Sequence, residues 1–180
     1  MLSATYQKNG MSEKRRHVQG EKLSAGEKPI VHFSLEGLLP KGEMLAVNRE
    51  LGVASILTYD GQNPQIRAEQ YFSPTEMSML LPLLSSYPEY CPNELLLASF
   101  SGRITEEEVH LARQRLLRAR ERGEWDMMMR PMRNALSRVR MKLNTLGIDV
   151  RSIFETGYLL RPYAEGSTVA CDDHRNPRDV

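Results

Sequence analysis

A basic amphipathic segment, followed at once by a short hairpin, places the strongest constraint on how this chain can fold. Between Arg130 and Asn144, apolar residues recur every three to four positions. This is the period of a helix with one buried face. A strand, a turn and a second strand are expected next, ending in the run from Glu155 to Leu160. The apolar stripe of the helix is predicted to hold Met132, Ala135, Leu136, Val139 and Leu143.

The opposite face of this helix favours contact with nucleic acid. The guanidinium group of arginine can donate two hydrogen bonds to a phosphate or to guanine, and the asparagine amide can pair with adenine. No acid occurs between residues 130 and 144. From Arg113 to Lys142 there are ten Lys and Arg residues against three acids, although the whole chain carries a net charge of only +1. A solvated surface face is the alternative, because most charge runs are solvated. The exposed face is predicted to hold Arg130, Arg133, Asn134, Ser137, Arg138, Met141 and Asn144.

Two further helices are predicted upstream. Ser73 and Glu76 have the spacing of a capping box, with Pro74 at the first helical position. Pro82 lies inside this helix and is expected to kink or break it, at a cost of about 3 kcal/mol. Pro92 is expected to open the next helix, so the pattern predicts three core helices and a hairpin.

At these positions the chain resembles the winged-helix DNA-binding domain of the OmpR/PhoB-type response regulators. In that family, a recognition helix ending in Arg-Leu-Arg-Lys-Lys-Leu precedes a wing hairpin that ends in Gly-Tyr and an apolar residue. The first helix of the family opens with Leu-Thr-Pro-Thr-Glu-Phe. Four segments match in the same order across roughly half of the chain: Phe72 to Leu81, Tyr90 to Leu96, Ser137 to Leu143 and Gly157 to Leu159.

The resemblance implies an α+β winged helix-turn-helix, with a three-helix core, a preceding small antiparallel sheet, a C-terminal wing and an inserted extra helix. The helix around 130–144 would enter the major groove of double-stranded DNA. Arg138, Arg133 and Asn134 would then lie nearest the bases. In the wing, Phe154 and Glu155 stand where the family often has Arg and Gly. The remaining candidates are Ser137 on the helix, Arg130, Arg140 and Lys142 for phosphates, and Arg151, Ser152 and Arg161 in the wing.

Arg140 has a second interpretation, because it can equally be pinned structurally near the edge of the core. The chain also departs from the family between Arg103 and Met129, where the family has a short loop. Thr105 and Glu108 predict a cap for an added helix, which Gly123 ends. Its outward arginines indicate a solvated face, a DNA backbone contact or a partner surface. RNA polymerase is the partner that the resemblance implies, and another protein is the alternative.

Composition changes divide the chain into three parts. Residues 1–29 are polar and predicted to form a disordered tail, in which Lys14 to Arg16 are expected to be solvated, with contact to the DNA backbone as the alternative. Residues 30–163 form the predicted DNA-binding domain. Within it, 30–72 are β-rich, 73–163 hold the helices and wing, and 103–129 are the insertion. Two strands are expected around Val31 to Leu35 and Val53 to Tyr59, with a turn at Asp60-Gly61. Residues 164–180 are expected to be a flexible tail.

The expected function is sequence-specific binding of double-stranded DNA in transcription regulation. The alternative is a winged-helix adaptor that binds another protein through residues 105–122. No enzyme is expected, because the histidines are scattered, no nucleophile or phosphate-loop motif occurs, and Cys171 to His174 lack a second metal-binding pair. No cofactor or metal is expected.

The polar start and the absence of a long apolar run predict a cytoplasmic protein without a membrane partner. The 72 residues before Ser73 leave no room for a receiver domain, so phosphorelay control is not implied. A homodimer on DNA is a further hypothesis.

Overall fold

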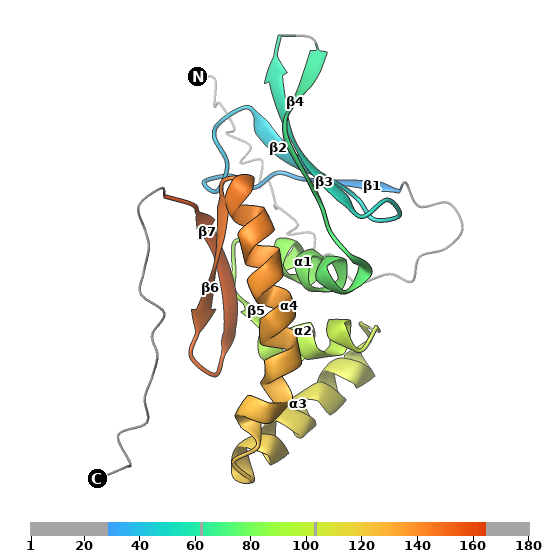
Figure 1. Ribbon diagram of the computed structural model, residues 1–180, viewed down its shortest axis with the longest axis vertical. Helices are drawn as coiled ribbons and strands as arrows, with labels where there is room; N and C mark the ends of the chain where they lie inside the picture. The colour runs from blue at the N-terminus through green and yellow to red at the C-terminus, as the bar shows by residue number, and fades with distance from the viewer. Residues whose placement is uncertain (1–28, 62, 103, 165–180) are drawn as a thin grey trace, which may run out of the picture.

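A computed structural model describes residues 29–61, 63–102 and 104–164 of the chain. The described part is an α+β fold with four helices and two antiparallel sheets. The long helix α4 runs beside the hairpin β6–β7, while a four-stranded sheet lies at one end and α3 at the other (Figure 1). The tails expected at 1–29 and 164–180 lie outside the described residues, apart from Pro29 and Ala164. The basic run Lys14 to Arg16 also lies outside them.

The first sheet contains β1 (Ile30–Phe33), β2 (Glu43–Asn48), β3 (Val53–Asp60) and β4 (Asn63–Tyr71), paired in that order. Leu45 pairs with Ile56 and Val47 with Ala54, and these four side chains are buried on the inner face. The predicted strands correspond to β1 and β3, whereas β2 was missed. β2 was missed because the four residues from Met44 to Val47 are all apolar, so no apolar-polar alternation marks a strand, although Pro40 and Gly42 form a turn before it. The segment that follows the predicted turn at Asp60-Gly61 forms β4.

Helix α1 (Pro74–Ser86) begins with the predicted capping box, in which Ser73 and Glu76 satisfy each other's backbone N–H. A kink or a break was expected at Pro82; the break does not occur, and the helix continues through this buried residue. A proline cannot donate to the carbonyl four residues earlier, which is that of Ser78. The buried hydroxyl of Ser99 donates to the Ser78 carbonyl instead. A side chain from α2 therefore replaces the missing backbone hydrogen bond.

The remaining helices are α2 (Asn93–Phe100), α3 (Glu106–Glu121) and α4 (Trp125–Thr145). Pro92 is the N-cap of α2, one residue before its predicted place. Thr105 caps α3 as predicted by accepting from the N–H of Glu108, and Gly123, at φ +71°, follows its end. The insertion contributes all of α3 and also the first turn of α4, which starts five residues before Arg130.

The second sheet joins β5 (Cys91–Pro92), β7 (Gly157–Pro162) and β6 (Ile148–Ile153) in the order β5-β7-β6. Gly157 pairs with Pro92 so closely that a Cβ at this position would collide with the carbonyl of Cys91. The glycine before Tyr158 is therefore required by contact between backbones. This short strand ties the hairpin to the segment between α1 and α2.

One hydrophobic core joins both sheets and all four helices. Leu45 and Ile56 reach it from the first sheet, Leu80 and Leu96 from α1 and α2, and Ile148 from β6. The segment 30–72 therefore shares its core with the helical part. None of the helices in the described residues is both long and apolar enough to span a membrane.

Candidate nucleic-acid interface

Helix α4 separates its side chains as the sequence pattern predicts. The apolar stripe is buried against the core, and the six residues from Arg130 to Met141 on the predicted outer face are exposed. Asn144 differs, being half-buried near the C-terminal end. Met132, Ala135, Leu136, Val139 and Leu143 are buried, whereas Arg130, Arg133, Asn134, Ser137, Arg138 and Met141 are exposed.

Two basic residues of α4 meet a buried acid on α1. Lys142 Nζ lies 2.6 Å from Glu76 Oε2, and Arg138 Nε lies 3.2 Å from Oε1 of the same carboxylate. The backbone N–H of Ser73 donates to Oε2 at 2.9 Å. Burial alone raises the pKa of Glu76, but the hydrogen bonds from Lys142 and Ser73 and the charge of Lys142 outweigh it and hold the pKa below its usual value. Glu76 therefore remains an anion at neutral pH and fixes both basic side chains.

Three further arginines converge on a second buried acid, Asp149 in β6. Their Nε atoms lie 2.8, 2.8 and 3.0 Å from the carboxylate, for Arg140, Arg151 and Arg161 respectively. Burial again raises the pKa of Asp149, while hydrogen bonds from Arg161 and Arg140 lower it more, so the net shift is downward. This cluster favours the structural interpretation of Arg140. Arg151 and Arg161, two of the three hairpin residues considered for DNA contacts, are thus paired with Asp149.

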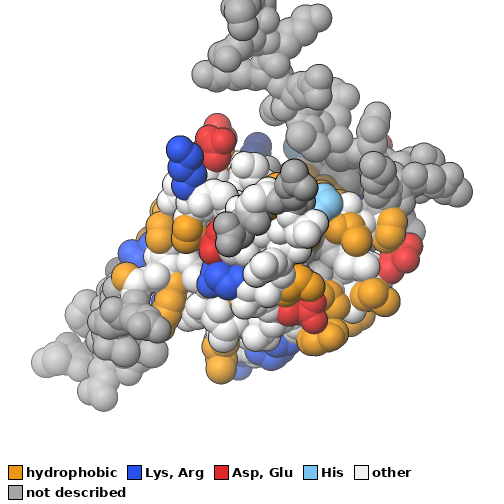
Figure 2. Space-filling model, turned by 90° about the horizontal axis from the view of Figure 1, so that it is seen from above, with side chains coloured by type: hydrophobic (Ala, Val, Ile, Leu, Met, Phe, Trp, Pro, Cys, Tyr) orange, Lys and Arg blue, Asp and Glu red, His pale blue; other side chains and the backbone are white. Residues whose placement is uncertain are grey.

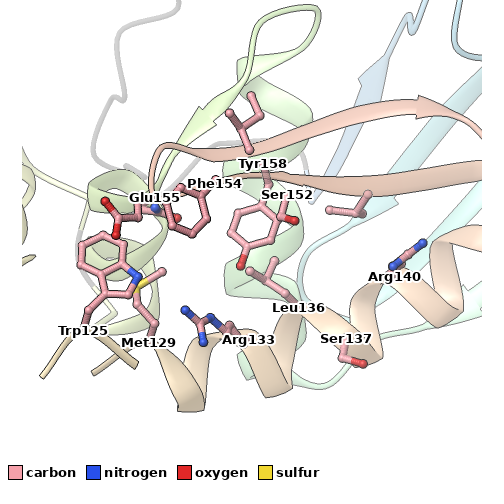
Figure 3. A pocket seen from close by; sticks show the side chains of 13 residues that line it. Trp125, Met129, Arg133, Leu136, Ser137, Arg140, Ser152, Phe154, Glu155 and Tyr158 are labelled. Carbon is pink, nitrogen blue, oxygen red and sulfur yellow. The ribbon is translucent and has the colours of Figure 1, made fainter. Parts of the chain in front are cut away.

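A cleft of about 540 Å³ lies between α4 and the hairpin. Figure 3 shows Arg133, Ser137 and Arg140 on the α4 side and Ser152, Phe154 and Tyr158 on the hairpin side. Four candidates from the sequence, Arg133, Ser137, Arg140 and Ser152, therefore lie around one cleft. Arg133 also pairs with the exposed Asp126 at 2.9 Å.

The arginines of α3 divide into two groups. Arg113 bridges Glu94 of α2 at 2.7 Å, and Arg120 bridges Glu155 in the β6–β7 turn at 2.9 Å. Glu155 has φ +50°, a conformation in which a residue with a side chain is strained. The other three, Arg115, Arg118 and Arg122, are exposed, and no described acid lies within ion-pair distance of them.

The end of the molecule that carries the first sheet has a different surface. In its visible part, Lys and Arg side chains are scattered among apolar and acidic ones (Figure 2). The exposed arginines of α3 and α4 instead occur at short intervals along two helices. The positive charge of the described chain is thus concentrated on these helices and not on the sheet.

Glu76 and Asp149 organise this region, but the sequence indicated only part of their role. Glu76 was recognised as a capping residue, whereas its contacts with α4 depend on packing between distant segments. Asp149 was missed, although a single acid between Ile148 and Val150 in an apolar run is a signal for a buried, paired carboxylate. Only the folded arrangement identifies its three partners.

No group of three His, Cys, Asp or Glu side chains in the described residues is arranged to hold a metal ion, and Cys171 to His174 lie outside the described part. Burial raises the pKa of the Cys91 thiol to about 12, so this thiol is protonated at neutral pH. Searches of protein-family models, curated proteins and solved structures found no match to this chain.

Proposed function

We propose that this chain is a sequence-specific double-stranded DNA-binding regulator of transcription with a winged helix-turn-helix fold. Helix α4 acts as the recognition helix in the major groove, and β6–β7 acts as the wing. The observation that carries the proposal is the exposed face of α4, which presents Arg130, Asn134, Ser137 and Arg138 without an acid among them. Such a face matches the donors and acceptors of base edges and phosphates.

The order of elements supports the same proposal. A sheet precedes α1, the short strand β5 precedes α2, and the hairpin β6–β7 follows α4 directly. These positions correspond to the order that the resemblance implies, with α3 as the inserted helix. No enzymatic activity, cofactor or metal is part of the proposal.

The ion pairs refine the roles of the candidate residues. Arg140 and Arg151 hold Asp149, and Lys142 holds Glu76, so their first role is to fix α4 and the hairpin. Arg130, Arg133, Asn134, Ser137 and Arg138 remain the residues proposed to meet DNA. Ser152, which is exposed on the hairpin, completes the set.

The test starts with the full chain and a pool of random-sequence duplexes. Repeated selection should enrich one sequence, and its binding constant should fall linearly with salt on a logarithmic scale because each phosphate contact releases counterions. Arg130→Ala should weaken binding and reduce the steepness of this salt dependence. Arg49→Ala, an exposed arginine after β2, is the matched control and should leave both unchanged. Absence of any enriched sequence, together with salt-independent binding, would contradict the proposal.

A second candidate is a protein-binding adaptor that uses α3. Leu111 and Leu117 are exposed on α3 in addition to the three arginines without a described partner, so this helix offers both apolar and charged contacts. Replacing Arg115, Arg118 and Arg122 together with Glu separates the two roles. Loss of DNA affinity for all sequences alike would assign α3 to the DNA backbone. Unchanged DNA affinity with lost regulatory output would assign it to a partner such as RNA polymerase.

A further inference from the structure

The cleft between α4 and β6–β7 has the size of a small-molecule site. Its volume of about 540 Å³ lies within the range of roughly 300–1,000 Å³ that ligand pockets occupy. A second cavity of about 240 Å³, under α3, shares Asn93, Trp125 and Glu155 with it. The cleft therefore adjoins the cavity under α3.

Aromatic side chains form much of the wall. Trp125 lies on α4, and Phe154 and Tyr158 lie on the hairpin, so the three rings approach the cleft from both sides (Figure 3). Met129 and Leu136 add aliphatic surface. These rings present flat apolar faces, which favours a ligand with an aromatic ring of its own.

Asn93 supplies a buried acceptor without a partner. The residue lines the cleft and is only 4% exposed, and no donor in the described residues reaches its Oδ1 atom. A buried carbonyl oxygen without a hydrogen bond is costly, so such atoms are nearly always satisfied. The atom has under 1 Å² of accessible surface, so it meets a ligand hydroxyl or N–H in the cleft once the Asn93 side chain turns toward the opening.

Arg133 supplies the positive charge. Arg140 also lines the cleft, but its Nε–H donates to buried Asp149, which holds this side chain in place. The counterion of Arg133 is Asp126, whose side chain is 82% exposed, so this pair is easily exchanged for another anion. An anionic group in the cleft can therefore pair with Arg133 in place of Asp126.

We propose that this cleft binds a small aromatic carboxylate that also carries a hydroxyl or amino donor. The ring lies among Trp125, Phe154 and Tyr158, the donor reaches Asn93 Oδ1, and the carboxylate pairs with Arg133. This ligand site is proposed independently of DNA binding, so it can be tested on the protein alone.

Trp125 is the only tryptophan of the chain, so its fluorescence reports on the cleft directly. The probe is 4-hydroxyphenylacetate, compared with 4-hydroxyphenylacetamide, which lacks the charge, and phenylacetate, which lacks the phenol donor. Binding of 4-hydroxyphenylacetate should change the Trp125 fluorescence and reach saturation as the ligand concentration rises. Each of the other two should bind about tenfold more weakly or worse, as expected when one charged or buried hydrogen bond is lost.

Two variants locate the site. Arg133→Gln should remove the preference for the acid over its amide, whereas Arg49→Gln, the same change far from the cleft, should retain it. Ser152→Phe adds a ring to the cleft from an exposed strand position and should abolish binding while the circular dichroism spectrum stays unchanged. The proposal is overturned if no probe gives a saturable change. It is equally overturned if binding persists in Ser152→Phe, or if the acid and the amide bind alike in the parent protein.

Discussion

Arg138 on α4 donates its Nε–H to the buried carboxylate of Glu76 on α1, across 3.2 Å. The arginine side chain remains 56% exposed, so its outer nitrogens still face solvent. Glu76 therefore orients a residue that the proposed function places in the major groove. An acid in a helix cap thus connects the stability of α1 with the geometry of the DNA-facing surface.

Replacing Arg138 should affect DNA recognition more than folding. Arg138→Ala opens no cavity, and Lys142 still neutralises Glu76. Binding to the selected sequence should weaken by about 1–3 kcal/mol, and binding to a scrambled duplex should weaken much less. Binding curves on both duplexes at one salt concentration measure the difference. Undiminished affinity of the folded variant for its best sequence would show that α4 does not read the major groove through this residue.

Replacing Glu76 should affect stability in a pH-dependent way. Gln at this position can still complete the cap, so Glu76→Gln removes mainly the charge seen by Lys142 and Arg138. Near neutral pH we expect a loss of about 1–3 kcal/mol in the free energy of unfolding. The pKa of Glu76 is lowered in the folded protein, so its stabilisation is present above the unfolded pKa and lost as the pH falls through the folded pKa.

Urea unfolding of the parent and of Glu76→Gln at neutral and at strongly acidic pH measures this loss. The difference between the two proteins should shrink toward zero in acid, even though other carboxyl groups also titrate. If the difference in unfolding free energy stays constant with pH, the ionised carboxylate of Glu76 does not contribute to stability.

The Asp149 cluster should be the most sensitive point of the hairpin. Asp149→Asn leaves Arg140, Arg151 and Arg161 without their common anion, and the loss of these charged hydrogen bonds costs about 1–3 kcal/mol because the arginines are partly exposed. Asp126→Asn is the matched control, because Asp126 also pairs with an arginine but is 82% exposed, and it should cost less than about 1 kcal/mol. Thermal melts of the two variants should differ clearly. Equal melting temperatures would show that the cluster is not structural.

Pro82 and Ser99 should be energetically coupled. In the parent, Ser99→Ala removes the donor to the Ser78 carbonyl and should cost about 1–3 kcal/mol. In Pro82→Ala the backbone N–H of residue 82 can donate to that carbonyl, so the same serine change should then cost less. A double-mutant cycle from urea unfolding gives the coupling energy directly. Additive losses would mean that the serine does not compensate for the proline.

The sequence predicted those features that local patterns determine. The stripe on α4, the caps of α1 and α3, and the outward arginines follow from spacing alone, and they are found where expected. The continuity of α1 through Pro82 was not predictable, because it depends on Ser99 from another helix. The internal pairing of Lys142, Arg140 and Arg151 was hidden for the same reason, since each partner acid is brought near only by tertiary packing. Strand β2 was missed because its alternation is weak.

Arg67 of β4 donates to the carbonyl of Leu146, just after the end of α4, and the inner face of the first sheet is one wall of the shared core. The sheet and the helices therefore cannot melt separately without exposing the same apolar side chains to water. Unfolding should be cooperative, with tryptophan fluorescence from α4 and circular dichroism from the whole chain changing at one temperature. The β-rich segment thus acts as a thermodynamic partner of α4, and a peptide that begins at Ser73 would lack the sheet face against which its helices pack.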